Sequence, residues 1–196
     1  MIVETERLIL RPFAESDRPA NAAIFADPQV RRFSLGVLDR AAADARLEEA
    51  MRQVERQGFG VLAVEHRADR ACIGMIGFTG FDAGLRGVIP SHPQLQLVWQ
   101  LDRRYWGQGL APEGAAALLP FAWDELHAPE VVAITARINL PSQRVMHKIG
   151  MTAAPADDFD HPRLPVGHEL RPHVLYRIEN PGAAAGTPPT PRSSPR

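Results

Sequence analysis

The sequence predicts a mixed α/β (α+β) fold, and three observations indicate it. Residues 59–81 contain two apolar, strand-like runs separated by a polar turn, which is the pattern of an antiparallel hairpin. From about residue 94 to residue 149, strand-like and helix-like segments alternate. No internal repeat is visible in the sequence. A hairpin region followed by one crossover unit predicts a mixed sheet rather than a repeating doubly wound sheet.

The N-terminal segments predict one strand and one helix. Residues 6–13 alternate Leu8 and Leu10 with polar neighbours, as a half-buried strand does. Ser16 is the expected N-cap of the helix that follows, and Pro28 is expected to close that helix.

A second helix is predicted over residues 40–57, because apolar side chains recur there at i, i+4 and i+7. Gly58 would end this helix, since glycine readily adopts the left-handed conformation found after helix C-termini. Residues 83–93 are rich in glycine and proline and are expected to form a loop.

The second half of the chain contains the alternating elements. Pro112 falls in the first turn of the predicted central helix, where a missing N–H is tolerated. The predicted elements are a strand over 94–102, a helix over 110–126, a strand over 131–138, a short helix over 142–149 and a last strand over 171–179. Residues 1–180 are therefore expected to form one domain. Residues 181–196 are rich in Pro, Gly and Ser and are expected to be a disordered tail.

The composition excludes several classes of protein. The 196 residues are 45% hydrophobic with a formal net charge of -1, so no global positive field favours nucleic acid or an anionic membrane. The single cysteine, Cys72, excludes an internal disulfide and a cysteine-cluster zinc site. His161, His168 and His173 match no metal-ligand spacing, so no metal is expected. The chain start does not have the pattern of a signal peptide, and a cytoplasmic location is expected.

A glycine-containing loop at 103–111 joins the predicted strand 94–102 to the central helix. Unpaired N–H groups and a positive dipole at a helix N-terminus favour an anion, and Gly107 and Gly109 leave room for a phosphate. Arg103 and Arg104 add positive charge nearby. A tight strand–helix turn without a ligand is the alternative. The loop lacks the Gly-Lys-Ser/Thr of a P-loop and the third glycine of a dinucleotide fingerprint, which argues against a nucleotide-binding oxidoreductase.

Residues 104–109, Arg-Tyr-Trp-Gly-Gln-Gly, match the pattern Arg/Gln-x-x-Gly-x-Gly/Ala. This pattern resembles the acyl-CoA pyrophosphate loop of the GNAT superfamily of N-acetyltransferases. The segments TERLILRPF, NLPSQRVMHKIGM and GHELRPHVLYRI resemble the branch of the ribosomal-protein N-terminal acetyltransferases (RimJ/RimL-like). Together these resemblances cover about residues 5–180 in the right order.

The resemblance implies a mostly antiparallel sheet, flanked by helices, that splays between the strands around the glycine loop. Acetyl-CoA, the cosubstrate, would lie in this splay. Its pantetheine arm would pair with the backbone of Val98, Trp99 and Leu101. The pyrophosphate would be held by backbone N–H groups of Gly107, Gln108, Gly109, Leu110 and Ala111, with Arg104 nearby. Asn139 would bond the pantetheine or the chain near it, and Ser142 would lie close to the sulfur. Both residues can alternatively serve as helix caps.

The implied reaction is direct transfer of an acetyl group from acetyl-CoA to a primary amine. The branch suggests a protein or peptide N-terminal amine, while small amines stay open. Ser142 is the candidate acid, because Met146 stands where the family often has a tyrosine. Gln96 replaces a common glutamate, so no base is identified. These departures favour the alternative, a noncatalytic acyl-CoA-binding or sensing module. A homodimer is left open.

Overall fold

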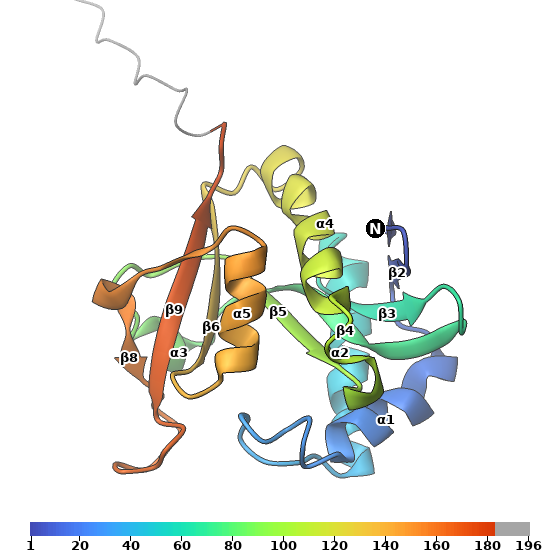
Figure 1. Ribbon diagram of the computed structural model, residues 1–196, viewed down its shortest axis with the longest axis horizontal. Coiled ribbons are helices and arrows are strands. Elements are labelled where there is room, and N and C mark those ends of the chain that lie inside the picture. Colours follow the sequence, from blue (N-terminus) through green and yellow to red (C-terminus); the bar gives the residue numbers. More distant parts are fainter. Residues whose placement is uncertain (183–196) are drawn as a thin grey trace, which may run out of the picture.

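Residues 1–182 are described by a computed structural model, in which helices flank a 9-stranded sheet (Figure 1). The strands lie in the order β1-β2-β3-β4-β5-β6-β9-β7, and β8 also pairs with β9. Within the described residues, β5 and β6 run parallel and the other paired strands run antiparallel. The predicted mixed, mostly antiparallel sheet is therefore confirmed. The strands are β1 Val3–Glu4, β2 Leu8–Arg11, β3 Val61–His66, β4 Ala71–Thr79, β5 Gln96–Leu101, β6 Glu130–Ala136, β7 Thr152–Ala153, β8 Phe159–Asp160 and β9 Pro172–Glu179.

The helices cover both faces of the sheet. Leu62 of β3 belongs to the main hydrophobic core together with Leu118 of α4, whereas the next residue, Ala63, packs with Leu47 of α2. Because successive side chains of a strand point to opposite faces, α4 and α2 lie on opposite sides of the sheet. The helices are α1 Arg18–Ala26, α2 Arg40–Gln57, α3 Ala83–Arg86, α4 Leu110–Asp124 and α5 Leu140–Lys148, with 3-10 turns at Glu15–Asp17, Arg103–Tyr105 and Pro155–Asp157.

Most predicted elements are present, and three details differ. The hairpin β3–β4 and the helix α2, which ends at a left-handed Gly58, are confirmed. Ser16 does not cap α1: it lies inside a 3-10 turn, and α1 begins two residues later with Asp17 before it. Strand β1 was not predicted, because two residues are too few to show alternation. The predicted loop 83–93 contains the short helix α3, which Asp82 caps through the N–H of Leu85.

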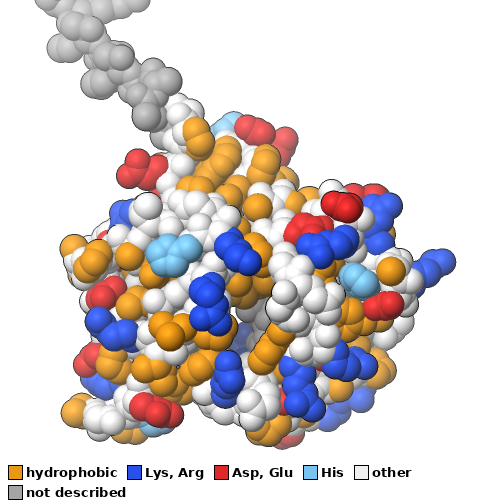
Figure 2. Space-filling model, viewed as in Figure 1, with side chains coloured by type: hydrophobic (Ala, Val, Ile, Leu, Met, Phe, Trp, Pro, Cys, Tyr) orange, Lys and Arg blue, Asp and Glu red, His pale blue; other side chains and the backbone are white. Residues whose placement is uncertain are grey.

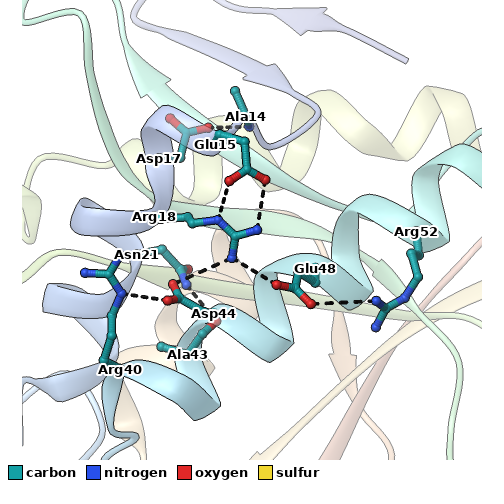
Figure 3. Close-up of polar contacts among 10 residues, drawn as sticks. All are labelled: Ala14, Glu15, Asp17, Arg18, Asn21, Arg40, Ala43, Asp44, Glu48 and Arg52. Carbon is teal, nitrogen blue, oxygen red and sulfur yellow. Dashed lines mark hydrogen bonds and ion pairs between the residues drawn. The ribbon is translucent and has the colours of Figure 1, made fainter.

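Ion pairs and one buried hydrogen bond join α1 to α2 (Figure 3). Arg18 of α1 donates from Nε and Nη2 to the carboxylate of Glu15. Its Nη1 also lies 3.2 Å from Oε1 of Glu48 on α2. The buried Asn21 donates a hydrogen bond to the carbonyl of Ala43 at 3.1 Å. Exposed ion pairs contribute little to stability, so the buried amide matters more for holding the two helices together.

The sheet splays between β5 and β6. Strand β5 pairs with β4 along its whole length, but with β6 it shares a single register position, Gln96 opposite Val132. Beyond that position the two strands separate, and α5 lies beside the gap (Figure 1). This confirms the splay that the family resemblance implied, and it leaves one edge of β5 without a partner strand.

In the described part of the chain, no helix is both long and apolar enough to cross a membrane. The tail predicted to be disordered lies outside the described residues from position 183 onward. The domain boundary at residue 180 stays a prediction.

Candidate active site

A pocket of about 580 Å³ occupies the splay between β5 and β6. Its walls are residues of β5 and β6, the glycine loop, the first turn of α4, one side of α5, and part of the segment 29–34. The face seen in Figure 2 is hollowed near its centre, and Lys and Arg side chains gather around the hollow. The predicted site residues that line the pocket are Val98, Trp99, Leu101, Gly107, Gly109, Leu110, Ala111, Asn139 and Ser142.

The glycine loop presents unpaired backbone donors at the N-terminus of α4. Gly107 and Gly109 have positive φ angles of 77° and 80°, which is the conformation that glycine adopts without strain. No described residue accepts a hydrogen bond from the backbone N–H of Gly107, Gln108 or Gly109. Leu110 and Ala111 follow in the first turn of α4, where N–H groups lack helical partners. The loop thus offers a row of donors suited to an anion such as a diphosphate.

A partly buried network holds this loop from behind. Glu113 of α4 accepts hydrogen bonds from the hydroxyl of Thr5 and from both the backbone N and Nε of Arg7. Arg7 in turn donates to the carbonyl of Gln108 at 2.9 Å. Burial acts to raise the pKa of Glu113, but the hydrogen bonds from Thr5 and Arg7 outweigh it and hold the pKa below its usual value. The carboxylate is therefore charged at neutral pH and fixes the loop to the N-terminal strands.

Two predicted site residues do not line the pocket. Arg104 pairs with Asp102, its Nη2 lying 2.6 Å from the carboxylate, and its side chain is 77% exposed. The side chain of Gln108 donates to the carbonyl of Arg104, so only its backbone N–H belongs to the row of donors. The charge of Arg104 is thus neutralised by a neighbour two residues away.

Asn139 and Ser142 lie where β6 passes into α5. The Asn139 side chain caps α5 by accepting from the N–H of Ser142 at 3.3 Å, and its Nδ2 donates to the Thr135 hydroxyl. The capping interpretation of Asn139 is therefore correct, and both ends of its amide are used within the protein. The Ser142 hydroxyl accepts a hydrogen bond from Nε1 of Trp99 at 3.2 Å, which leaves its proton free to be donated.

The backbone of β5 faces the gap at alternate residues. The backbone N–H of Val132 in β6 donates to the carbonyl of Leu95, and the backbone N–H of Asp102 donates to the carbonyl of Ile73 in β4. Because the backbone groups of a strand alternate in direction, the odd-numbered residues Trp99 and Leu101 face the gap, as does Leu97. Val98 lines the pocket, but its backbone N–H and C=O face β4, where it pairs with Gly77.

Three further cations line the pocket and were not among the predicted site residues: Arg32, Arg144 and Lys148. Among the described residues, no carboxylate forms a salt bridge with any of the three. Arg144 and Lys148 are four residues apart on α5, so they share one helix face. This spacing in the sequence, directly after Ser142, was the signal that could have identified them.

His173 of β9 also lines the pocket and stacks near His161, with ring centres 4.8 Å apart. Burial lowers the pKa of His173 to about 4, so its ring is neutral at neutral pH. Within residues 1–182, no three His, Cys, Asp or Glu side chains are grouped as a metal site would require. Met146, at the position where a tyrosine acid is often found, is buried in the core.

Comparison with known proteins identifies the family. Residues 7–152 match the family model for the acetyltransferase (GNAT) domain. The chain is 25% identical to the uncharacterized N-acetyltransferase YoaA of Bacillus subtilis over 153 residues, 76% of this chain and 81% of that protein. The crystal structure of an acetyltransferase from Agrobacterium tumefaciens is 26% identical, with a TM-score of 0.72 and coverage of 91% of this chain and 94% of that one.

A third similar structure is RimL, a ribosomal L7/L12 α-N-protein acetyltransferase in complex with coenzyme A. It is 15% identical, with a TM-score of 0.73 and coverage of 91% of this chain and 98% of that one, and it therefore supports the fold. The matched domain spans the glycine loop, the splayed strands and α5. The chain accordingly belongs to the GNAT family and is an acetyl-CoA-dependent N-acetyltransferase.

Proposed function

We propose that the pocket between β5 and β6 binds acetyl-CoA and that the acceptor amine approaches from the other side of β5. The observation that carries this proposal is the row of unpaired backbone N–H groups over residues 107–111, at the N-terminus of α4. Such donors suit the diphosphate of coenzyme A. Arg32, Arg144 and Lys148 add positive charge around the same pocket and have no acidic partner among the described residues.

Bound acetyl-CoA would supply the acetyl group as a thioester. The unpaired edge of β5 would hold the pantetheine through the backbone of Leu97, Trp99 and Leu101, with one N–H left to stabilise negative charge on the carbonyl oxygen. Ser142 would donate its proton to the departing sulfur, since Trp99 orients its oxygen by donating to it. No carboxylate lines the pocket within the described residues, so we assign removal of the amine proton to water.

A protein or peptide N-terminal amine is the proposed acceptor. The likeness of the N-terminal, α5 and last-strand segments to the RimJ/RimL-like branch supports it, as does the shared fold with RimL. A second pocket beside β5 is lined by three of the β5 residues that also line the first pocket. It would give an amine a route to the acetyl group at this strand.

Thermal unfolding with acetyl-CoA, coenzyme A and NADH, followed by thiol release over a panel of amines and peptides, tests the proposal. Acetyl-CoA at a hundredfold excess over its Kd should stabilise the protein by about 2.7 kcal/mol, and NADH should not. Thiol release should require an amine. No stabilisation by either CoA species would exclude the proposed binding site. Stabilisation without thiol release on any amine would instead indicate a noncatalytic acyl-CoA-binding module.

Changing Ser142 to alanine should lower kcat with little change in the Kd for acetyl-CoA. Loss of a positioned proton donor costs roughly 10²- to 10⁴-fold, and a serine with water nearby should fall at the lower end of that range. Ser142→Thr, which keeps a hydroxyl, serves as the matched control. Unchanged kcat in the alanine variant would reduce Ser142 to a structural residue at the start of α5.

A further inference from the structure

A second pocket, of about 450 Å³, lies on the other side of β5 from the acetyl-CoA pocket. Its walls come from α1, α2 and the sheet, and it shares with the first pocket the β5 residues Val98, Trp99 and Gln100. The two pockets therefore meet at this strand. If the first binds acetyl-CoA, as proposed above, an amine held in the second would reach the acetyl group at β5. The inference below rests on that proposed function.

Two arginines that line this second pocket lack acidic partners. Arg31 is only 9% exposed, and within residues 1–182 neither Arg31 nor Arg46 forms a salt bridge with a carboxylate. Both guanidinium groups lie near the same ring, 5.3 Å and 5.5 Å from the centre of Phe25. Burial, together with the charge of Arg46, lowers the pKa of Arg31 to about 10. A charged arginine is almost never buried without an acidic partner, so the position of the buried Arg31 is costly in the free protein.

The hydrogen bonds of Arg31 leave donors unused. Its Nε donates to the carbonyl of Gly36 at 2.9 Å, and its Nη1 makes a long contact of 3.4 Å with the side-chain oxygen of Gln100. A guanidinium has five N–H donors, so further donors of Arg31 have no partner among the described residues. The side chain of Arg46 has no hydrogen bond to any described residue. This side chain is exposed to solvent. Partial desolvation by the surrounding protein, together with the charge of Arg163, nevertheless lowers the pKa of Arg46.

Gln100 adds a third unused donor from β5. Its side-chain nitrogen is buried and has no hydrogen-bond partner among the described residues. One acidic residue, Glu49, also lines the pocket, but its carboxylate already accepts from Arg52 and Arg56. Donors of Arg31, Arg46 and Gln100 thus border one pocket in which, among residues 1–182, the single lining carboxylate is engaged elsewhere.

We propose that this pocket selects acceptors that carry an anionic group, a carboxylate or phosphate, in the same molecule as the amine. Arg31 and Arg46 would bind the anion, for which the planar guanidinium is well suited, and Gln100 would donate to it beside β5. The amine would thereby be directed toward the strand that the two pockets share. The substrate class is an acidic amine, either a small molecule or the start of an acidic peptide.

Acceptors in matched acid and neutral pairs test this inference. We would measure kcat/KM for β-alanine and β-alaninamide, for amidated tetrapeptides with Glu or Gln at the second position, and for phosphoethanolamine and ethanolamine. The wild type should prefer the acidic member of at least one pair. Because hydrogen bonds to charged groups are worth ~1.5–3 kcal/mol, Arg46→Gln should reduce that preference roughly 10- to 100-fold.

Arg40→Gln is the matched control, since it removes the same charge from α2 at a residue that does not line the pocket and whose partner, Asp44, does not line it either. It should leave the preference unchanged. The Kd for acetyl-CoA should be the same in all three proteins. Equal rates for acidic and neutral acceptors, or a preference that survives in Arg46→Gln, would overturn the inference while leaving the acetyltransferase proposal intact. Failure of the wild type to bind acetyl-CoA would instead overturn the proposal on which it rests.

Discussion

Replacing Gly109 with valine is expected to raise the Kd for acetyl-CoA by about 10- to 100-fold, because one or two hydrogen bonds to the charged diphosphate would be lost. Gly109 has a φ angle of 80°, which a β-branched residue adopts only under strain. The new Cβ would point toward Arg7, whose Nη2 lies 3.7 Å from that position. The backbone would therefore have to rearrange just where it presents its N–H groups. Isothermal titration with acetyl-CoA measures the change.

Gly58→Val is the control that distinguishes loss of acetyl-CoA binding from the general effect of backbone strain. Gly58 has a similar φ angle of 77° with no heavy atom near the added Cβ, and it ends α2 away from both pockets. Both variants should lose stability by roughly 1–3 kcal/mol. Only Gly109→Val should lose affinity. An unaltered Kd in that variant would contradict the assignment of the loop.

Changing Gly77 to alanine is expected to cause a large loss of stability for the addition of a single methyl group. A Cβ at this position would lie 2.2 Å from the carbonyl oxygen of Gly60 and 2.5 Å from the Cα of Val61. Both contacts are with backbone, so no side chain can move aside, and β3 and β4 would have to separate. Overpacking of this kind costs roughly 1–3 kcal/mol or more.

Thermal unfolding checks this second prediction. In a chain of this size, each kcal/mol lowers the Tm by about 2–4 °C, so the Tm should fall by roughly 2–12 °C. Gly80→Ala is the control, because no heavy atom lies within 4 Å of a Cβ added there. A Tm within a degree of wild type for Gly77→Ala would show that the two strands tolerate a wider separation than their packing indicates.

The glycine loop and its surroundings could be predicted because their signals are local. Positive φ angles need glycine, and an anion site at a helix N-terminus needs only the strand–loop–helix order, both of which the sequence displays. The resemblance of Asn139 and Ser142 to the family pattern was local as well. The structure brings both residues to the pocket between β5 and β6.

The rest depended on side-chain directions and on contacts between distant parts of the chain. That Arg104 would be neutralised by Asp102 depends on side-chain direction, which a sequence does not give. The network of Thr5, Arg7 and Glu113 joins residues more than a hundred positions apart. Likewise, the unpaired state of Arg31 is visible only when every neighbour is known. Sequence patterns indicate which face of its own helix or strand a residue occupies. The Glu113 network and the surroundings of Arg31 are instead formed by several elements together.

The single shared register position between β5 and β6 has a consequence for the mechanics of the domain. Strands β1–β5 and strands β6–β9 form two half-sheets that are joined by few backbone hydrogen bonds. Local opening between them therefore breaks fewer interactions than opening within either half, and the free energies of such openings differ across a structure. A ligand that pairs with the free edge of β5 and also contacts α5 would act as a cross-link between the halves. Cosubstrate binding would then make the domain unfold more cooperatively, as a single unit rather than two.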